Sequence, residues 1–530
     1  MRLMWESAAV ALLLACAQVQ AQQEACSVEG RVVNNVTGAA VRRATLTLTG
    51  ASAIKVAVES GDNGQFAFPG LVPGRYTLAA ERTGFISRSG SPLVLTAAQR
   101  MKGVVLKLAP AAAISGRVVG EDGEPMAVPL LAVLFQASYQ RGVRHWLPLK
   151  TTPVNDLGEF RLPNLTAGSY LVAAQLNRNP MAGVSARAPA GQPEREYATM
   201  TYFPSTADPA KASAIPVAAG EEASGKVVQM LKVEAVRIAG KVAGGAEGRQ
   251  VIVRLIPKGA ASPMLATLQG MLAICNGNDG SFEMTGVAPG AYSLMTWLSN
   301  GPGAQLFANV PLQVAEQDIE GLILQPAPAA DLAGAIVVAD RTPAERKGIR
   351  VDLEARGWPG FNANATVDER GMFTVKNIAP TEYRMALANL PEGWYVKSMR
   401  YGEQDVSEGD LDLSGGVTGS LQITVSAAGA QVDGVVRGAD DKPVSGATVV
   451  LVPDSRRHSL FKETRAGEDG SYSIKGVAPG EYAILAWEDI ESGAYEDPEV
   501  LKPFESQAAK LSLKDSDHKN VPLTVISSRK

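Results

Sequence analysis

The three histidines of the chain are the first residues to test for metal or acid–base chemistry. A zinc hydrolase gathers histidines and a carboxylate around one metal ion. Here His145, His458 and His518 lie in the polar stretches RHWLP, RRHSLF and SDHKN, and none has a glutamate three residues later. We therefore expect solvated histidine side chains and no zinc peptidase site.

Other catalytic signatures are also missing from the sequence. It contains no GxSxG nucleophile elbow, no phosphate-binding GxxxxGK(S/T) loop and no CxxC pair. Each of these motifs holds a reactive group or a phosphate on a tight turn, so their absence removes the main hydrolase, nucleotide-binding and redox classes. We predict a non-enzymatic protein without catalytic residues.

Aromatic residues outside the repeated pattern are the best candidates for ligand contact. Flat aromatic faces stack on sugar rings, so a carbohydrate-binding protein presents tryptophan or tyrosine. The candidates are Trp146, Trp297, Trp358, Trp394, Trp487 and Tyr495. The alternative is that these rings fill the edges of the domains or anchor loops.

An acidic loop after Trp487 is the one candidate metal site. Its six carboxylates, without a base among them, are Glu488, Asp489, Glu491, Glu496, Asp497 and Glu499. Carboxylate oxygens are the ligands that Ca²⁺ prefers. An exposed acidic loop can equally stay solvated. The sequence leaves a Ca²⁺ site at Glu488–Glu499 open and implies no other cofactor.

The amino-terminal segment has the features of an export signal. Arg2 precedes an apolar run at residues 8–17, and the tripeptide VQA ending at Ala21 fits a signal-peptidase site, so we expect residues 1–21 to be removed. The stretch LLAC ending at Cys16 also resembles a lipobox, which would make Cys16 a lipidated first residue. No later segment reaches the roughly 18 apolar residues of a membrane span. We predict an exported protein in the periplasm, at the outer surface or outside the cell.

The charge balance excludes nucleic acid as a partner. The 530 residues carry 50 basic and 54 acidic side chains, a net charge of -4, which provides no basic surface for a phosphate backbone. The two cysteines beyond the signal, Cys26 and Cys275, fall in distant parts of the chain. We expect free or buried thiols rather than a disulfide.

One phrase recurs five times along the chain. Its copies are DNGQFAFPGLVPGRYTL at 62, DLGEFRLPNLTAGSYLV at 156, NDGSFEMTGVAPGAYSL at 278, ERGMFTVKNIAPTEYRM at 369 and EDGSYSIKGVAPGEYAI at 468. In each copy a glycine is followed twelve residues later by a tyrosine. Repetition at intervals near a hundred residues indicates tandem domains.

The repeated phrase also predicts the local structure. Apolar residues alternate with period two on both sides of a turn, which is typical of half-buried strands. We expect the opening glycine to be left-handed, the Pro-Gly pair of the phrase to form a turn with positive φ at its glycine, and the tyrosine hydroxyl to bond nearby backbone. Thr381 replaces that glycine in the fourth copy, so we expect a different turn there.

The sequence thus predicts an all-β protein of five tandem antiparallel seven-stranded β-sandwich domains after a signal peptide. Matching starts, such as VEGRVV around Gly30, and paired apolar ends set the boundaries. The predicted domains are residues 26–108, 112–232, 235–326, 330–426 and 429–526, with a Pro/Ala-rich insertion at 178–205 in the second.

This pattern resembles the carboxypeptidase regulatory-like domain. The resemblance rests on the GxV starts, the turns EDGEPMA at 121–127 and ADDKPVSGATV at 439–449, and the phrase DGxYxIxGVxPGxY. It implies transthyretin-like or starch-binding-like sandwiches over nearly the whole mature chain, as in exported bacterial proteins that string such domains together. It does not imply the zinc peptidase beside which such domains can occur.

These observations favour an exported, non-enzymatic binding protein. The resemblance to a starch-binding-like fold and the unrepeated tryptophans suggest a glycan or cell-envelope polymer as the ligand. The alternative is a structural or adhesive spacer, or a scaffold that joins another surface protein without binding a small molecule.

Overall fold

The computed structural model describes residues 26–50, 55–177, 199–244, 251–258, 265, 268–299, 305–339, 346–356 and 361–527. The predicted signal at 1–21, most of the insertion at 178–205, and Trp358 lie outside these residues. The described chain is nearly all β, and the all-β prediction is confirmed. None of its helices is long and apolar enough to cross a membrane.

The strands pair into successive two-sheet sandwiches, which we number by their strands. Sandwich 1 contains β1 (Cys26–Asn34), β2 (Thr45–Gly50), β3 (Lys55–Glu59), β4 (Gln65–Leu71), β5 (Gly74–Glu81), β6 (Arg88–Leu95) and β7 (Arg100–Leu108). Sandwich 2 contains β8 (Ala112–Val119), β9 (Leu130–Gln140), β10 (Val143–Pro153), β11 (Glu159–Leu165), β12 (Gly168–Leu176), β13 (Thr201–Tyr202), β14 (Ile215–Val217) and β15 (Glu222–Gln229). Sandwich 3 contains β16 (Val236–Val242), β17 (Ile252–Pro257), β18 (Met271–Ile274), β19 (Ser281–Val287), β20 (Gly290–Ser299), β21 (Gln305–Val314), β22 (Ile319–Leu324) and β23 (Ala327–Pro328).

The remaining strands form two further sandwiches. Sandwich 4 contains β24 (Ala330–Val338), β25 (Arg350–Ala355), β26 (Ala363–Thr366), β27 (Met372–Ile378), β28 (Glu382–Ala388), β29 (Tyr395–Tyr401), β30 (Gln404–Asp405), β31 (Asp410–Asp412) and β32 (Leu421–Ser426). Sandwich 5 contains β33 (Ala430–Arg437), β34 (Thr448–Pro453), β35 (Lys462–Arg465), β36 (Ser471–Val477), β37 (Gly480–Trp487), β38 (Ala509–Leu513), β39 (His518–Asn520) and β40 (Leu523–Thr524). The short helices are η2 (Pro209–Lys211), η3 (His458–Leu460), η4 (Ala494–Glu496), α4 (Pro498–Leu501) and η5 (Lys502–Gln507).

In each sandwich one sheet is built around the first strand, and in sandwiches 1 to 3 it is the smaller of the two sheets. In sandwiches 1 to 3 the orders are β4-β1-β7, β11-β8-β15 and β19-β16-β22. The first strand pairs antiparallel with the strand of the repeated phrase but parallel with the last strand, so the sheets are mixed where we predicted antiparallel ones. A parallel pair needs a long crossover between its strands, and the other sheet of each sandwich supplies it.

The glycine at the start of each unit is explained by this parallel pair. A Cβ on Gly30 would lie 2.0 Å from the carbonyl oxygen of Val104, and one on Gly116 would lie 1.8 Å from that of Lys226. The last strand therefore approaches the first so closely that only glycine fits at the crossing point.

Two predictions about the repeated phrase are confirmed. The opening glycines are left-handed, with φ of 72° at Gly64 and 70° at Gly280. The five tyrosine hydroxyls each donate to the carbonyl four residues earlier, at 2.8 to 3.1 Å, from Tyr76, Tyr170, Tyr292, Tyr383 and Tyr482. The phrase therefore fixes the same corner in every sandwich.

The turn predicted at Pro-Gly is wrong in detail. The left-handed residue of this turn is the glycine before the Val-Ala-Pro stretch, with φ of 76° at Gly286, whereas φ at Gly290 is 159° and nearly extended. Asn377 takes the left-handed place in sandwich 4, with φ of 56°, because asparagine tolerates this conformation better than most residues. Thr381, where we expected a different turn, corresponds to a nearly extended glycine, which explains how a β-branched residue stands there. The phrase carries the chain from the small sheet, as β19, to the large sheet, as β20.

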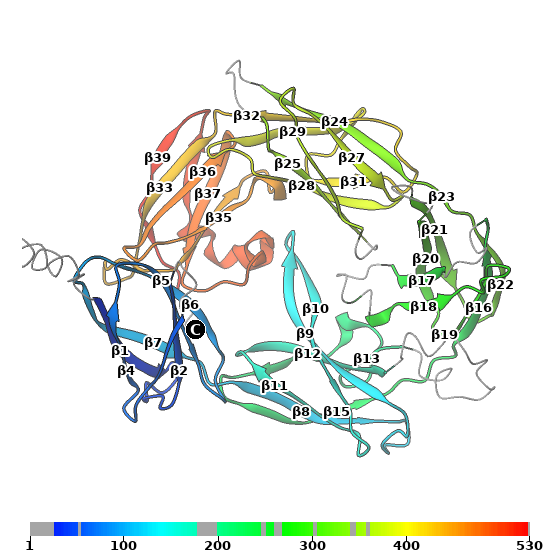
Figure 1. Cartoon of the computed structure of the whole chain (residues 1–530), viewed down its shortest axis with the longest axis horizontal. Coiled ribbons are helices and arrows are strands. Elements are labelled where there is room, and N and C mark those ends of the chain that lie inside the picture. Colours follow the sequence, from blue (N-terminus) through cyan, green and yellow to red (C-terminus); the bar gives the residue numbers. More distant parts are fainter. Residues whose placement is uncertain are drawn as a thin grey trace, which may run out of the picture.

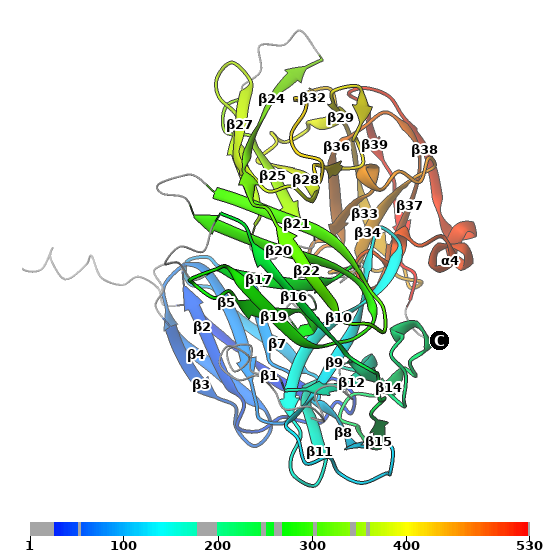
Figure 2. The ribbon, with the colours of Figure 1, turned by 90° about the vertical axis from the view of Figure 1, so that its right-hand side faces the viewer.

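The sandwiches follow one another around a central space (Figure 1). The sheets that contain the first strands lie on the outside of this arc, and the other sheets face its centre (Figure 1). Sandwiches 1 and 5 come together in Figure 1 but are displaced from each other in Figure 2, so the arc does not close between them. The hairpin of β9 and β10 leaves sandwich 2 and reaches across the centre.

Candidate functional site

At the tip of the β9–β10 hairpin, parts of the arc that are distant in sequence meet near its centre (Figure 1). Both strands have eleven residues, against six and five in β2 and β3 of sandwich 1. The turn residues Arg141 and Gly142 have φ of 52° and 69°, as a two-residue turn between strands requires. The length of the hairpin carries this turn to sandwiches 4 and 5.

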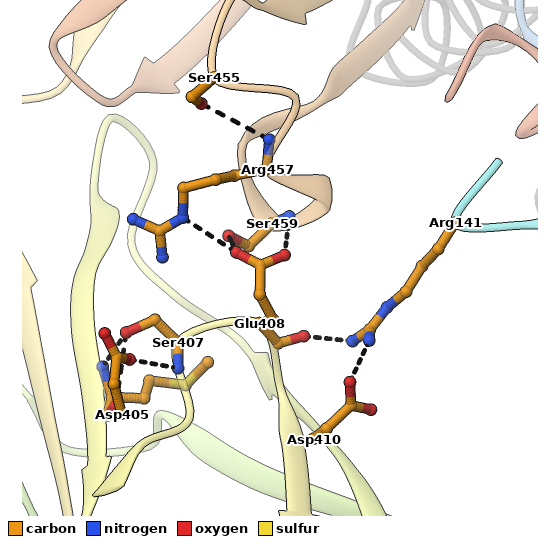
Figure 3. Close-up of polar contacts among 9 residues, drawn as sticks. Arg141, Asp405, Ser407, Glu408, Asp410, Ser455, Arg457 and Ser459 are labelled. Carbon is orange, nitrogen blue, oxygen red and sulfur yellow. Dashed lines mark hydrogen bonds and ion pairs between the residues drawn. The ribbon is translucent and has the colours of Figure 1, made fainter. Parts of the chain in front are cut away.

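Arg141 joins the hairpin to sandwich 4. Its guanidinium forms an ion pair with Asp410 and donates to the backbone carbonyl of Glu408 (Figure 3). The other carboxylate oxygen of Asp410 lies 3.1 Å from Nη2 of Arg356. Asp410 therefore holds arginines from two sandwiches at once, and a charge-assisted contact of this kind is stronger than a neutral hydrogen bond.

Glu408 joins the same point to sandwich 5. Its carboxylate accepts from Nε of Arg457 at 3.0 Å and from Oγ of Ser459 at 3.1 Å (Figure 3). Burial raises the pKa of Glu408, but the hydrogen bonds from Arg457 and Ser459 outweigh burial and hold the pKa below its ordinary value. We call Arg141, Glu408, Asp410, Arg457 and Ser459 the Glu408 node, because Glu408 links sandwiches 2, 4 and 5.

The hairpin tip also packs directly on sandwich 5. A Cβ on Gly142 would lie 2.5 Å from the carbonyl oxygen of Glu496, and one on Gly493 would lie 2.8 Å from that of Tyr139. The side chain of Glu496 lies 2.7 Å from Nδ1 of His458. The solvated histidine expected at 458 is therefore wrong, since His458 is half-buried beside the docked hairpin.

Trp487 and Tyr495 lie inside sandwich 5. Their exposed fractions are 3% and 6%, and they share a cluster with Leu501 and Ile526. The hydroxyl of Tyr495 donates to the carboxylate of Glu463, and burial raises its pKa to about 12. Both rings are covered in this structure, so neither offers an open face for stacking.

Trp146, Trp297 and Trp394 lie where sandwiches meet. Trp146 packs against a cluster that includes Leu265 of sandwich 3, with the guanidinium of Arg144 4.7 Å from its ring centre. The ring centre of Trp297 is 5.1 Å from that of Phe361 in sandwich 4, and the guanidinium of Arg254 is 5.0 Å from it.

Trp394 occupies the junction between sandwiches 4 and 5. Its ring packs on the core of sandwich 4, and its carbonyl oxygen lies 2.4 Å from where a Cβ on Gly476 would be. The same junction holds the hydrogen bond from Tyr395 to Asp515 at 3.1 Å and the ion pair of Lys475 with Glu392 at 2.8 Å. Trp297 thus lies at the junction of sandwiches 3 and 4, and Trp394 at the next junction, between sandwiches 4 and 5.

Two carboxylates of the acidic loop accept hydrogen bonds within the protein. Asp497 accepts from the backbone N–H of Glu499 at the start of α4, and Glu488 accepts from Oγ of Ser527 at 2.9 Å. In the described chain, no three histidine, cysteine or acidic side chains are grouped to hold a metal ion. A Ca²⁺ site here stays a prediction from sequence.

Both cysteines predicted to be free or buried, Cys26 and Cys275, are free and buried.

The residues of the Glu408 node could not be chosen from the sequence. Arg141 and Asp410 are 269 positions apart, and neither belongs to a motif. The one signal is negative: the stretch from Tyr139 to Trp146 has no counterpart in the other four units. A departure from the repeat marks the position without identifying its partner.

Comparison with known proteins identifies part of the chain. Residues 27–109 match the model of the carboxypeptidase regulatory-like domain, and no curated protein matches the chain. A streptococcal ancillary pilin is 10% identical over 55% of this chain and 99% of its own, with a TM-score of 0.19. The minor pilin of Streptococcus agalactiae is 11% identical over 40% and 96%, with a TM-score of 0.22. The major pilin subunit of Bacillus cereus is 10% identical over 57% and 99%, with a TM-score of 0.17.

At such low scores the pilin structures support no conclusion about function. The family match covers sandwich 1, and the recurring phrase extends the same sequence pattern through the other four.

Proposed function

We propose that this protein is an exported, non-enzymatic scaffold that holds its sandwiches in one fixed arc and presents their outer sheets to a surface protein. The observation that carries the proposal is the Glu408 node. One residue of sandwich 4 uses its carbonyl for sandwich 2 and its carboxylate for sandwich 5.

Rigidity follows from the way the contacts are connected. Domains joined only in series normally move relative to each other, because their interfaces are small and polar. Here the hairpin adds a cross-link between units that are distant in sequence, so sandwiches 2, 3, 4 and 5 form a closed circuit. Moving one junction then requires breaking a second contact elsewhere in the circuit.

The tryptophan rings already contact other side chains of the protein, and this favours a protein partner over a glycan. Trp487 is buried, Trp297 contacts Phe361 and Arg254, and Trp146 contacts Arg144. A sugar-binding platform needs a free aromatic face, whereas these rings contact neighbouring side chains or lie in the core. Stacking on a glycan or cell-envelope polymer through these residues would require the junctions to open.

Small-angle X-ray scattering of the full mature chain tests the scaffold. A compact chain of this length has a radius of gyration of about 24 Å, and five sandwiches in line would give roughly 50 Å. We expect a value much closer to the first, unchanged with concentration. A value near the second would refute the fixed arc. Retention of the intact chain on a polysaccharide column, lost on Trp146→Ala, would favour the glycan instead.

A further inference from the structure

The edge strand β22 of sandwich 3 is an open edge of an outward-facing sheet. β22 pairs with β16 and with no other strand of the described chain. The carbonyl of Leu324 accepts from the N–H of Ala243 at 2.8 Å, so the polar backbone groups of Leu324 face β16. Because successive residues of a strand point their backbone groups to opposite sides, the N–H and C=O of Ile323 face the open side.

One large apolar side chain next to this edge is more exposed than its counterparts in two other sandwiches. Ile323 is 69% exposed, compared with 55% for Val105 and 46% for Val227 at the corresponding positions of sandwiches 1 and 2. A shallow cavity of about 850 Å³ lies on the same sheet, lined by Lys241, Phe282 and Ile323 among others. The lining also includes the charged residues Arg237, Glu283 and Glu320. An extended segment laid along β22 would cover Ile323.

Corresponding edges in three other sandwiches are protected. The last strand of sandwich 1 carries Lys102 and Lys107. In sandwich 2 the end of the last strand is covered by Pro204 and Ser205, which hydrogen-bond to it through backbone and side chain. In sandwich 5 the edge consists of two short strands separated by a gap that contains Pro522. Charge, cover and proline are the usual protections of sheet edges.

Within the part of the chain that the structure describes, no segment covers β22, and its single charge is already paired. Its one charged residue, Glu320, is in an ion pair with Arg237 of the neighbouring strand. The strand holds no lysine and no proline, and the rest of its sequence is Ile, Gly, Leu, Ile and Leu. A sequence of this kind on a free edge is suited to pairing with a further strand.

Sandwich 4 shows which occupant fits this edge. Gly334 lies opposite Leu421 there as Gly240 lies opposite Leu322 in sandwich 3, so β32 corresponds to β22. β32 is covered by β29, which pairs with it antiparallel and places Arg400 opposite Gln422. Ile323 corresponds to Gln422, so a strand on β22 would place an apolar residue opposite Ile323.

We propose that β22 binds an extended strand of a partner protein, added antiparallel to the sheet as β29 is added to β32. Its specificity would come from an apolar side chain opposite Ile323 and from backbone hydrogen bonds to that residue. The inference rests on the proposed scaffold function, since it names where on the scaffold the partner attaches.

A labelled peptide tests the edge directly. The probe is a fluorescein-labelled heptapeptide with the sequence of β29 carrying Arg400→Val, titrated into the full mature chain. We expect saturable binding by fluorescence anisotropy and slower hydrogen exchange of the amides at 320–324. Ile323→Pro removes the outward-facing donor without removing a bond to β16, and we expect it to weaken binding at least about tenfold. Val105→Pro, the matched change in sandwich 1, should leave the affinity unchanged.

The outcomes separate this inference from the scaffold itself. Absence of saturable binding to a chain whose scattering is compact would overturn the strand addition and leave the scaffold intact. Binding that survives Ile323→Pro would also overturn it. Concentration-dependent dimerisation that disappears in Ile323→Pro would assign the edge to a second copy and not to a partner. Extended scattering would instead contradict the scaffold, whatever the peptide does.

Discussion

Gly142→Ala should release the hairpin tip from sandwich 5. The φ of 69° at Gly142 costs an alanine roughly 1–2 kcal/mol in a left-handed conformation. The new Cβ would also lie 2.5 Å from the carbonyl oxygen of Glu496. A relaxed contact between carbon and oxygen is about 3.3–3.6 Å, so the tip must retreat by roughly 1 Å. Such a shift disrupts the packing of the tip on Glu496 and weakens the hydrogen bond from Arg141 to the carbonyl of Glu408, at a combined cost of about 1.5–3 kcal/mol.

A matched control separates the strain from the lost contact. Gly123 of the same sandwich has φ of 80°, and a Cβ there would meet nothing within 4 Å. Gly123→Ala therefore costs the strain alone, and the difference between the variants is about 1.5–3 kcal/mol. At about 1.4 kcal/mol for each factor of ten, hydrogen exchange of the amides at 494–497 should be about ten to a hundred times faster in Gly142→Ala. Equal exchange in the two variants would show that the tip is not docked and would refute the reasoning.

Three further predictions concern the node, the parallel strand pair and a junction. The folded-state pKa of Glu408 is lowered. The ionised carboxylate therefore stabilises the folded chain above the ordinary pKa of about 4.3, and this stabilisation is lost as pH falls through the folded value. Glu408→Gln should reduce the acid-induced rise in hydrogen exchange at 457–459 and cost about 0.5–1 kcal/mol of folding stability at neutral pH. Gly116→Ala, whose Cβ would lie 1.8 Å from the carbonyl oxygen of Lys226, should destabilise sandwich 2 by more than about 3 kcal/mol in thermal unfolding. Trp297→Ala should cost about 3 kcal/mol and raise the radius of gyration, and an unchanged radius would contradict its place in the junction.

The corners of the sandwiches were predictable because their causes are local. Each tyrosine hydroxyl donates to a carbonyl four residues earlier, and each opening glycine supplies the positive φ that one turn requires. A short stretch of sequence contains every partner of such a residue. The exact glycine that turns left-handed was missed, because Gly286 and Gly290 both precede the tyrosine, and only the crossing from one sheet to the other distinguishes them.

The Glu408 node was beyond prediction for the opposite reason. Its ion pairs join residues separated by 269 and 49 positions, and each depends on how whole sandwiches are oriented. The tryptophans illustrate the same limit. Their isolated positions suggested ligand contact, but Trp297 packs at a junction and Trp487 in the core of sandwich 5. An aromatic ring that contacts a neighbouring domain and one that binds a sugar have the same appearance in a sequence.

Differences between the copies explain why the arc is not a uniform repeat. Identical units joined by identical contacts propagate without limit, as a ring if the rotation closes and as a helix if it does not. In this chain the hairpin of sandwich 2 is an addition that breaks the series, because its tip meets Glu408 and Glu496 in two later units. The repeated residues thus build each sandwich, and the unrepeated residues of the hairpin fix sandwich 2 against sandwiches 4 and 5. By the same logic, β22 is of interest because it lacks a covering strand that its counterpart in sandwich 4 possesses.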